Sequence, residues 1–193
     1  MKLTIQHQET YSRGQLLLRS FFGFIYIVIP HAFLLFFVAI AANVLNFIAW
    51  WAVLFTGKYP KGMYDFQVNF LNWQLRLNAS MYHLVDGYPP FGFNKWEKAN
   101  FEIEYPEKLS RGLLLLRTFF GIIYVFIPHG FCLFFRAIGT AVLAFLAWWA
   151  VLFTGKYPAN WHAFNVGTYR WSMRVQTYMS FLTDQYPPFT GKE

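Results

Sequence analysis

The chain has 193 residues, of which 56% are hydrophobic, 23% aromatic and only 13% charged. A soluble domain carries about 25% charged residues, so this chain has too few charges to cover a soluble surface while hiding 24 Phe, 12 Tyr and 8 Trp. The hydrophobicity excludes a disordered chain, and the single cysteine excludes a disulfide scaffold. The composition therefore predicts a small integral membrane protein.

The formal charge is +7, from 16 Lys and Arg against 9 Asp and Glu. These charges flank apolar stretches and do not gather on a polar module, which disfavours nucleic acid as a partner and favours anionic lipid headgroups. Residues 1–11 are polar, and no small-residue cleavage site ends the first apolar run. We therefore expect no signal peptide.

The two halves of the chain align without a gap when the sequence is shifted by 98 positions. From Tyr11 to Phe91, 47 of 81 positions are identical in the second copy, and the run at 49–60 recurs unchanged at 147–158. So many identities indicate a tandem duplication, in which each copy is one structural unit. The resulting divisions are a first membrane repeat at 1–91, a linker at 92–100 and a second membrane repeat at 101–193.

Each repeat is expected to contain the same elements in the same order. A short alternating segment, at residues 3–7 or 101–105, predicts a half-buried strand. Ser12 and Ser110 then open a long apolar region as helix N-caps. A Thr-Gly-Lys-Tyr-Pro sequence ends that region, and a Tyr-Pro-Pro-Phe corner ends the helix that follows, because proline disfavours helix in the residue before it. This last helix is expected to be amphipathic, over residues 61–85 and 159–183.

The apolar region of the first repeat, residues 15–55, has 41 residues, about twice the 20 that one bilayer crossing needs. We favour a transmembrane hairpin with a turn near residues 38–46, because Arg136 in the second copy would then reach water at the tip. The second arm of this hairpin is short for a full crossing. A rival interpretation makes residues 30–55 one tilted span, preceded by a shorter membrane-embedded helix.

The expected fold is thus a mainly α integral membrane protein of two tandem repeats. Each repeat has a short strand, a transmembrane helical hairpin and an amphipathic interfacial helix. Because each hairpin returns the chain to its starting side, the flanking basic residues except Arg136 would share one face with both strands. The positive-inside rule then predicts cytoplasmic termini, and the two strands are expected to pair across the duplication.

Four short motifs occur once in each repeat. Pro-His lies at 30–31, Phe-Thr-Gly-Lys-Tyr-Pro at 55–60, Trp-x-x-Arg at 73–76 and Asp-x-Tyr-Pro-Pro-Phe at 86–91, and each recurs 98 residues later. Together they resemble, over nearly the whole chain, the bacterial membrane family catalogued as domain of unknown function 4389. The resemblance implies a multi-pass protein of the bacterial inner (cytoplasmic) membrane. It brings no reaction, ligand or catalytic residue.

Two kinds of site residue stand out in or beside the apolar regions. The aspartates that end the third helix lie where the helix dipole disfavours a negative charge, so each is expected to form a structural ion pair with a cation on the same side of the membrane. That cation is either the arginine of the first helix or the lysine of the Thr-Gly-Lys-Tyr-Pro sequence, Lys58 or Lys156. The histidines follow a proline and are expected to help satisfy the backbone that proline leaves unpaired, since no second metal ligand lies at chelating spacing. The candidate structural or headgroup-binding residues are Arg19, Arg117, Arg76, Arg174, Asp86, Asp184, His31 and His129.

The sequence contains no Ser-His-acid triad, phosphate-cradling glycine loop or metal motif, so we expect no catalysis, cofactor or metal. The leading hypothesis is a non-catalytic accessory or scaffold subunit that contacts lipid or a larger membrane complex. One alternative is a lipid or hydrophobic-ligand binding protein, with the four arginines around headgroups. The other is a small homo-oligomeric channel or transporter, although the polar stripe along one helix that would favour transport is limited to Asn43 and Asn46. Membrane lipids, a membrane-protein partner or further copies of the chain are the expected partners.

Overall fold

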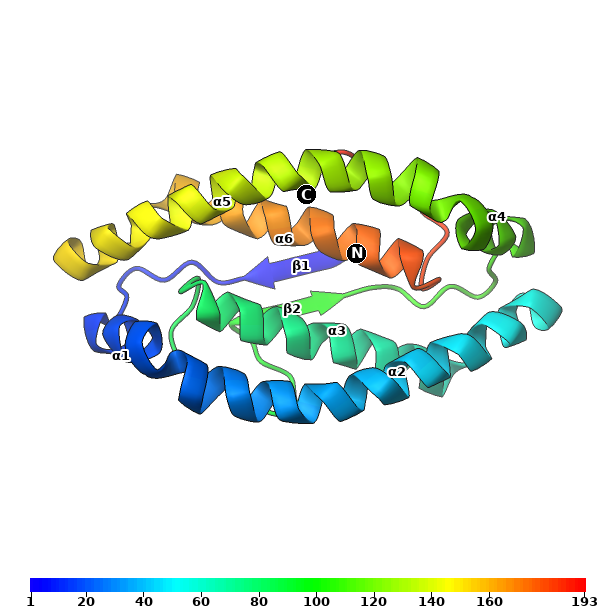
Figure 1. Ribbon diagram of the computed structural model, residues 1–193, viewed down its shortest axis with the longest axis horizontal. Helices are drawn as coiled ribbons and strands as arrows, with labels where there is room; N and C mark the ends of the chain where they lie inside the picture. Colours follow the sequence, from blue (N-terminus) through cyan, green and yellow to red (C-terminus); the bar gives the residue numbers. More distant parts are fainter.

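The computed structural model describes all residues, 1–193, and is mainly helical with one two-stranded sheet (Figure 1). The first repeat contains β1 Lys2–Ile5, α1 Arg13–Gly23, a π-helical segment Phe24–Val28, α2 Ile29–Thr56 and α3 Lys61–Met81. The second contains β2 Ala99–Glu102, α4 Arg111–Gly121, a π-helical segment Ile122–Phe126, α5 Ile127–Thr154 and α6 Ala159–Met179.

The apolar region of each repeat forms one unbroken helical stretch of 44 residues, Arg13–Thr56 and Arg111–Thr154. No turn interrupts residues 38–46, so the transmembrane hairpin that we favoured is wrong. The polar Asn43 does not mark a turn, because its side-chain amide donates to the carbonyl of Ala39 in the preceding turn of the same helix, at 2.8 Å.

Arg136 also lies inside the continuous helix and not at a hairpin tip. Its guanidinium donates to the hydroxyl of Thr168 at 2.9 Å and lies over the Phe164 ring, with its central carbon 4.3 Å from the ring centroid. Since Thr168 and Phe164 belong to α6, this arginine is shielded by the neighbouring helix of its own repeat. An arginine in an apolar run therefore did not require a turn.

Each long helix changes direction at its π-helical segment, just before a proline (Figure 1). Pro30 has no N–H to donate, and a proline ring clashes with the carbonyl four residues back, here that of Tyr26. The helix widens at this point, so that the N–H of Ile29 bonds to the carbonyl of Phe24. The chain thus runs as a shorter helix followed by one long helix.

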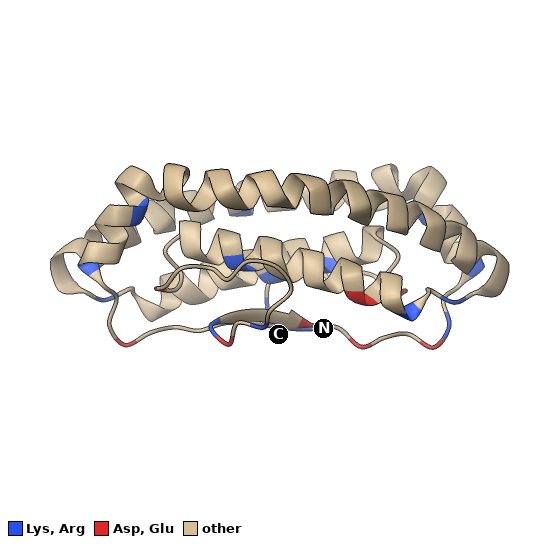
Figure 2. Ribbon diagram, turned by 90° about the horizontal axis from the view of Figure 1, so that it is seen from below, with Lys and Arg blue, Asp and Glu red and all other residues tan.

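The helices and the sheet are stacked in layers. α2 and α5 run antiparallel along the two long sides, with α3 and α6 between them (Figure 1), while the sheet and both termini lie beneath the middle of the molecule (Figure 2). α3 packs against both α2 and β2. Accordingly, its consecutive residues Leu71, Asn72 and Trp73 are all buried. The helix that we expected along a membrane interface is therefore packed inside the protein.

β1 and β2 pair antiparallel across the duplication, as expected. Leu3 lies opposite Phe101 and Ile5 opposite Ala99, and all four side chains are buried. The sheet therefore ties the start of the first repeat to the start of the second.

Side chains of α3 and α6 cover the two outer edges of this sheet. The amide of Asn72 donates to the carbonyl of Phe101 at 2.9 Å and accepts from its N–H at 2.8 Å, as a neighbouring strand would do. Arg170, at the equivalent position of the second repeat, donates to the carbonyl of Leu3 at 3.4 Å. Both edges are thereby closed to pairing with a further strand.

Candidate functional site

A buried ion pair joins the first helix of the first repeat to the segment after the third. Arg19 Nη2 donates to Asp86 Oδ1 at 2.6 Å, and the two side chains are 2% and 10% exposed. Arg19 also donates to the carbonyls of Gln15, Ser80 and Val85. Four of the five N–H groups of the guanidinium are thus bonded within the protein.

The same pair forms between Arg117 and Asp184 in the second repeat. Each aspartate also accepts from the backbone N–H of the serine that caps the first helix, Ser12 or Ser110, at 2.6 Å. The carboxylates therefore lie at the positive end of a helix dipole, which stabilises them. The expected ion pairs are present. The sequence placed each aspartate only at the C-terminal end of the third helix, whereas the fold brings it to the N-terminal end of the first helix.

Arg76 and Arg174 hold the segments that follow the two Tyr-Pro-Pro-Phe corners. The buried Arg76 donates to the carbonyl of Gly92 at 2.7 Å and to that of Asn94. Arg174 likewise donates to two backbone carbonyls near the C-terminus. Each guanidinium thus fixes a corner of its own repeat.

His31 and His129 lie where each Tyr-Pro-Pro-Phe corner packs against the long helix, and both are fully buried. The Nδ1 atom of His31 accepts from the indole N–H of Trp73 at 2.8 Å. Its ring stacks on Phe91 with the centroids 4.0 Å apart and the planes inclined by 9°. The second repeat has the same arrangement around His129, including the bond from Trp171 at 2.9 Å.

A tyrosine, and not the histidine, satisfies the backbone group that the proline frees. The carbonyl of Tyr26 loses its helical partner because Pro30 has no N–H, and it accepts instead from the hydroxyl of Tyr88 at 3.1 Å. The hydroxyl of Tyr186 donates to Tyr124 in the same way at 2.9 Å. This role was not predicted from the sequence, although a tyrosine precedes Pro-Pro in both copies.

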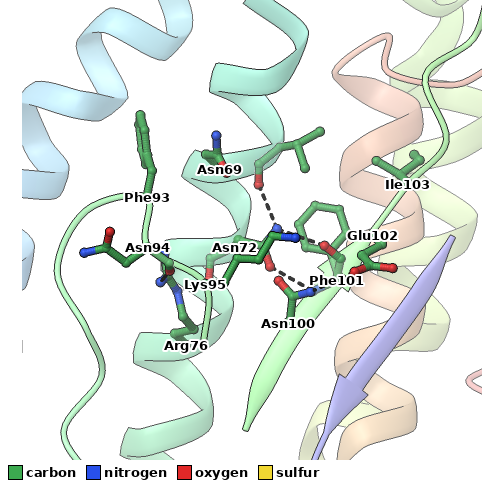
Figure 3. A pocket seen from close by; sticks show the side chains of 11 residues that line it. Asn69, Asn72, Arg76, Phe93, Asn94, Lys95, Asn100, Phe101, Glu102 and Ile103 are labelled. Atoms are coloured by element: carbon green, nitrogen blue, oxygen red, sulfur yellow. Dashed lines mark hydrogen bonds between the residues drawn. The ribbon is translucent and has the colours of Figure 1, made fainter. Parts of the chain in front are cut away.

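A hollow of about 170 Å³ lies between α3, β2 and the linker (Figure 3). Among its lining residues, Arg76 is bonded to linker carbonyls and Asn72 to the backbone of Phe101. At the equivalent place in the second repeat, Gly191 packs directly against Gly167. The hollow is therefore lined by groups that fasten the linker to the sheet.

Motifs from opposite repeats meet at the two ends of the molecule. The carbonyl of Gly155 accepts from the N–H of Tyr11 at 2.8 Å, and Arg13 donates to the carbonyl of Phe153 at 3.0 Å. A cation is stabilised at a helix C-terminus, here that of α5. The reciprocal bonds join Leu109 to Gly57 and Arg111 to Phe55. The sequence identified these arginines only as flanking charges, because their partners are far away along the chain.

Replacing Gly57 by Ala is expected to lower the free energy of unfolding by about 1 kcal/mol. Gly57 ends α2 with a φ of 72°, a left-handed conformation that a Cβ disfavours. The control is Gly130→Ala in α5, where an added Cβ meets no atom within 4 Å and helix propensity should add about 0.5–1 kcal/mol. Denaturant unfolding in detergent, followed by tryptophan fluorescence, measures both changes. Changes of the same sign would contradict this assignment.

His162 lies at the contact between the repeats, near the sheet. Its Nε2 atom is 3.0 Å from the carbonyl of Leu84, and its ring packs on those of His7 and Tyr157, with centroid distances of 4.9 and 5.5 Å. Burial lowers the pKa of His162 to about 4. The bond to Leu84 opposes this shift, and the neighbouring His7 adds to it.

Because this pKa is lower in the folded chain than the ordinary 6.5, the unfolded chain takes up the proton first as the pH falls. The stability that neutral His162 contributes is therefore complete above pH 6.5 and is lost as the pH falls toward 4. The expected slope is at most about 1.4 kcal/mol per pH unit. His162→Tyr introduces the residue found at position 64 of the first repeat. This substitution should remove the part of the pH dependence of stability that His162 contributes. Unfolding curves of both proteins between pH 4 and 7 test this, and parallel pH dependences would contradict it.

The exposed apolar side chains concentrate on the two long helical stretches. Of 40 exposed large hydrophobic residues, 34 belong to Arg13–Thr56 and Arg111–Thr154. Phe21, Phe119 and Phe153 are each at least 70% exposed. Soluble monomers rarely expose apolar patches larger than a few hundred Å². By length and composition, both stretches are able to cross a membrane.

Charged residues are almost absent from this surface. α2 contains none, and α5 contains only Arg136. Asp and Glu lie in the lower layers, among the loops, the sheet and the inner helices (Figure 2). We call the exposed apolar side chains of Arg13–Thr56 and Arg111–Thr154 the apolar face.

One family model matches the chain twice, over residues 17–92 and 114–191, with the description domain of unknown function (DUF4389). The chain belongs to the DUF4389 family. The two matches fit the tandem duplication, and each DUF4389 unit ends just after a Tyr-Pro-Pro-Phe corner. No curated protein and no solved structure was found to match this DUF4389 chain.

Proposed function

We propose that this DUF4389 chain is a non-catalytic membrane protein, an accessory or scaffold subunit of the bacterial inner membrane that contacts lipid or a larger membrane complex. The observation that carries the proposal is the apolar face, which holds 34 of the 40 exposed large hydrophobic residues. Water disfavours such a surface, whereas lipid hydrocarbon or an apolar partner stabilises it. The termini would lie on the cytoplasmic side.

The bonding of the buried polar residues supports a structural role over headgroup binding. Arg19, Arg117 and Arg76 are each at most 3% exposed and donate to groups of the chain itself. A lipid phosphate would have to displace these bonds. The fixed polar groups thus stabilise the fold, and the apolar face is the surface left for partners.

Extraction of membranes with alkaline carbonate, followed by native mass spectrometry without added lipid, tests this proposal. The protein should remain in the membrane pellet and then appear with a co-purifying protein at fixed stoichiometry, or with retained lipid. Recovery in the soluble fraction would contradict a membrane role. A homo-oligomer free of lipid and other proteins would instead favour the channel hypothesis.

A further inference from the structure

We propose that the protein lies within one leaflet of the membrane, with α2 and α5 parallel to the membrane plane. The apolar face would be immersed in the acyl chains, and the sheet with both termini would face water. This inference rests on the proposed function, because it specifies how the same apolar face contacts lipid. Three features of the structure support it.

The first feature is the position of the sheet relative to the long helices. The sheet lies beneath the middle of α2 and α5 (Figures 1 and 2), and its exposed pair Lys2 and Glu102 lies opposite each other across the strands. If α2 ran along the membrane normal, these charges would lie near the bilayer centre. Each charge there costs about 2.5 kcal/mol or more. With α2 parallel to the membrane, both charges stay in water.

The second feature is the presence of basic residues at both ends of the long axis. The bond from Arg13 to Phe153 places Arg13 beside Lys156 at one end, and the reciprocal bond places Arg111 beside Lys58 at the other. A crossing along the long axis would therefore place basic residues on both sides of the membrane, whereas the positive-inside rule concentrates them on one side. In the flat placement both ends approach the same layer of anionic headgroups, which suits a net charge of +7.

The third feature is the size of the apolar face. α2 has 28 residues, about 42 Å of helix, against a hydrocarbon core of about 30 Å. Laid flat, one helix is about 10–12 Å thick, which fits the roughly 15 Å of hydrocarbon in one leaflet. Phe33, Ile40 and Phe47, spaced by seven residues, are exposed on one side of α2, while Ala42 and Ala49 are buried on the other.

Labelling of single cysteines from defined sides of the membrane tests the placement. The full chain carries Cys132→Leu, the residue at the equivalent position 34, and one further substitution. The positions are Lys58→Cys and Lys156→Cys at opposite ends, Glu102→Cys on the sheet and Ile40→Cys on the apolar face. Right-side-out and inverted vesicles from a bacterial host are treated with a membrane-impermeant maleimide.

We expect the two end positions and the sheet position to react in the same vesicle preparation and to be protected in the other. Ile40→Cys should be protected in both until detergent is added. Reaction of Lys58→Cys and Lys156→Cys in opposite preparations would overturn the flat placement but leave the proposed membrane function standing. If the variants and the parent do not sediment with membranes, the proposed function fails together with this inference.

Discussion

Replacing Asp86 by Asn is expected to lower the free energy of unfolding by about 3–5 kcal/mol. The substitution keeps the size of the side chain but leaves the Arg19 guanidinium, which is 2% exposed, without its counter-charge. It also weakens the acceptor of the Ser12 N–H at the start of α1. Denaturant titration in detergent, followed by tryptophan fluorescence, measures the loss.

Two matched variants decide whether burial causes this effect. Asp65→Asn breaks the exposed pair with Lys61, whose side chains are 60% and 48% exposed, and should cost less than about 1 kcal/mol. Asp184→Asn should fall between the two, since the Asp184 side chain is 27% exposed. An effect of Asp86→Asn no larger than that of Asp65→Asn would mean that the buried pair does not stabilise the repeat.

The duplication made several contacts predictable from the sequence. Because the aspartates and their candidate cations occur in both copies, an ion pair within each repeat follows from charge balance. The fold then selects Arg19 and Arg117 over Lys58 and Lys156 as the partners. The strand pairing follows from two alternating segments that each lack a partner within their own repeat. Both predictions depended only on which charged groups and strand edges require a partner. Neither depended on the course of the helices.

The course of the long helices was not predictable in the same way. A region of 41 apolar residues fits a hairpin of two short arms and one continuous helix equally well by length. The choice depended on Arg136, which α6 shields through Thr168 and Phe164. A hydropathy value depends on the residue alone and not on its tertiary contacts. It therefore could not predict that α6 shields Arg136.

The contacts between repeats were missed for a related reason. The segment Ser12-Arg13-Gly14, which recurs at 110–112, contacts the Thr-Gly-Lys-Tyr-Pro sequence of the other repeat only because the two repeats pack antiparallel. This packing places Arg13 on the last turn of α5. Within one repeat the two motifs lie at opposite ends of a 44-residue helical stretch. The recurrence of both sequences indicated that each repeat needs them. It did not indicate their partners, because the partner of each sequence lies in the other repeat.

Replacing Trp73 by Phe is expected to lower the free energy of unfolding by about 3 kcal/mol. The smaller ring leaves a gap at a position that is 3% exposed. It also removes the N–H that satisfies the buried Nδ1 of His31, and an unsatisfied buried acceptor alone costs about 1–3 kcal/mol. Because His31 stacks on Phe91, the corner at the end of the repeat should loosen too. The same denaturant titration measures the change.

Trp51→Phe is the control, since Trp51 is 43% exposed and its replacement should cost less than about 1 kcal/mol. A double-variant cycle with His31→Phe then separates the hydrogen bond from packing. If the bond matters, removing both polar partners costs less than the sum of the single effects, because no buried acceptor remains unpaired. Additive effects would mean that ring volume alone fixes the corner, and that the Trp–His pair contributes nothing through its hydrogen bond.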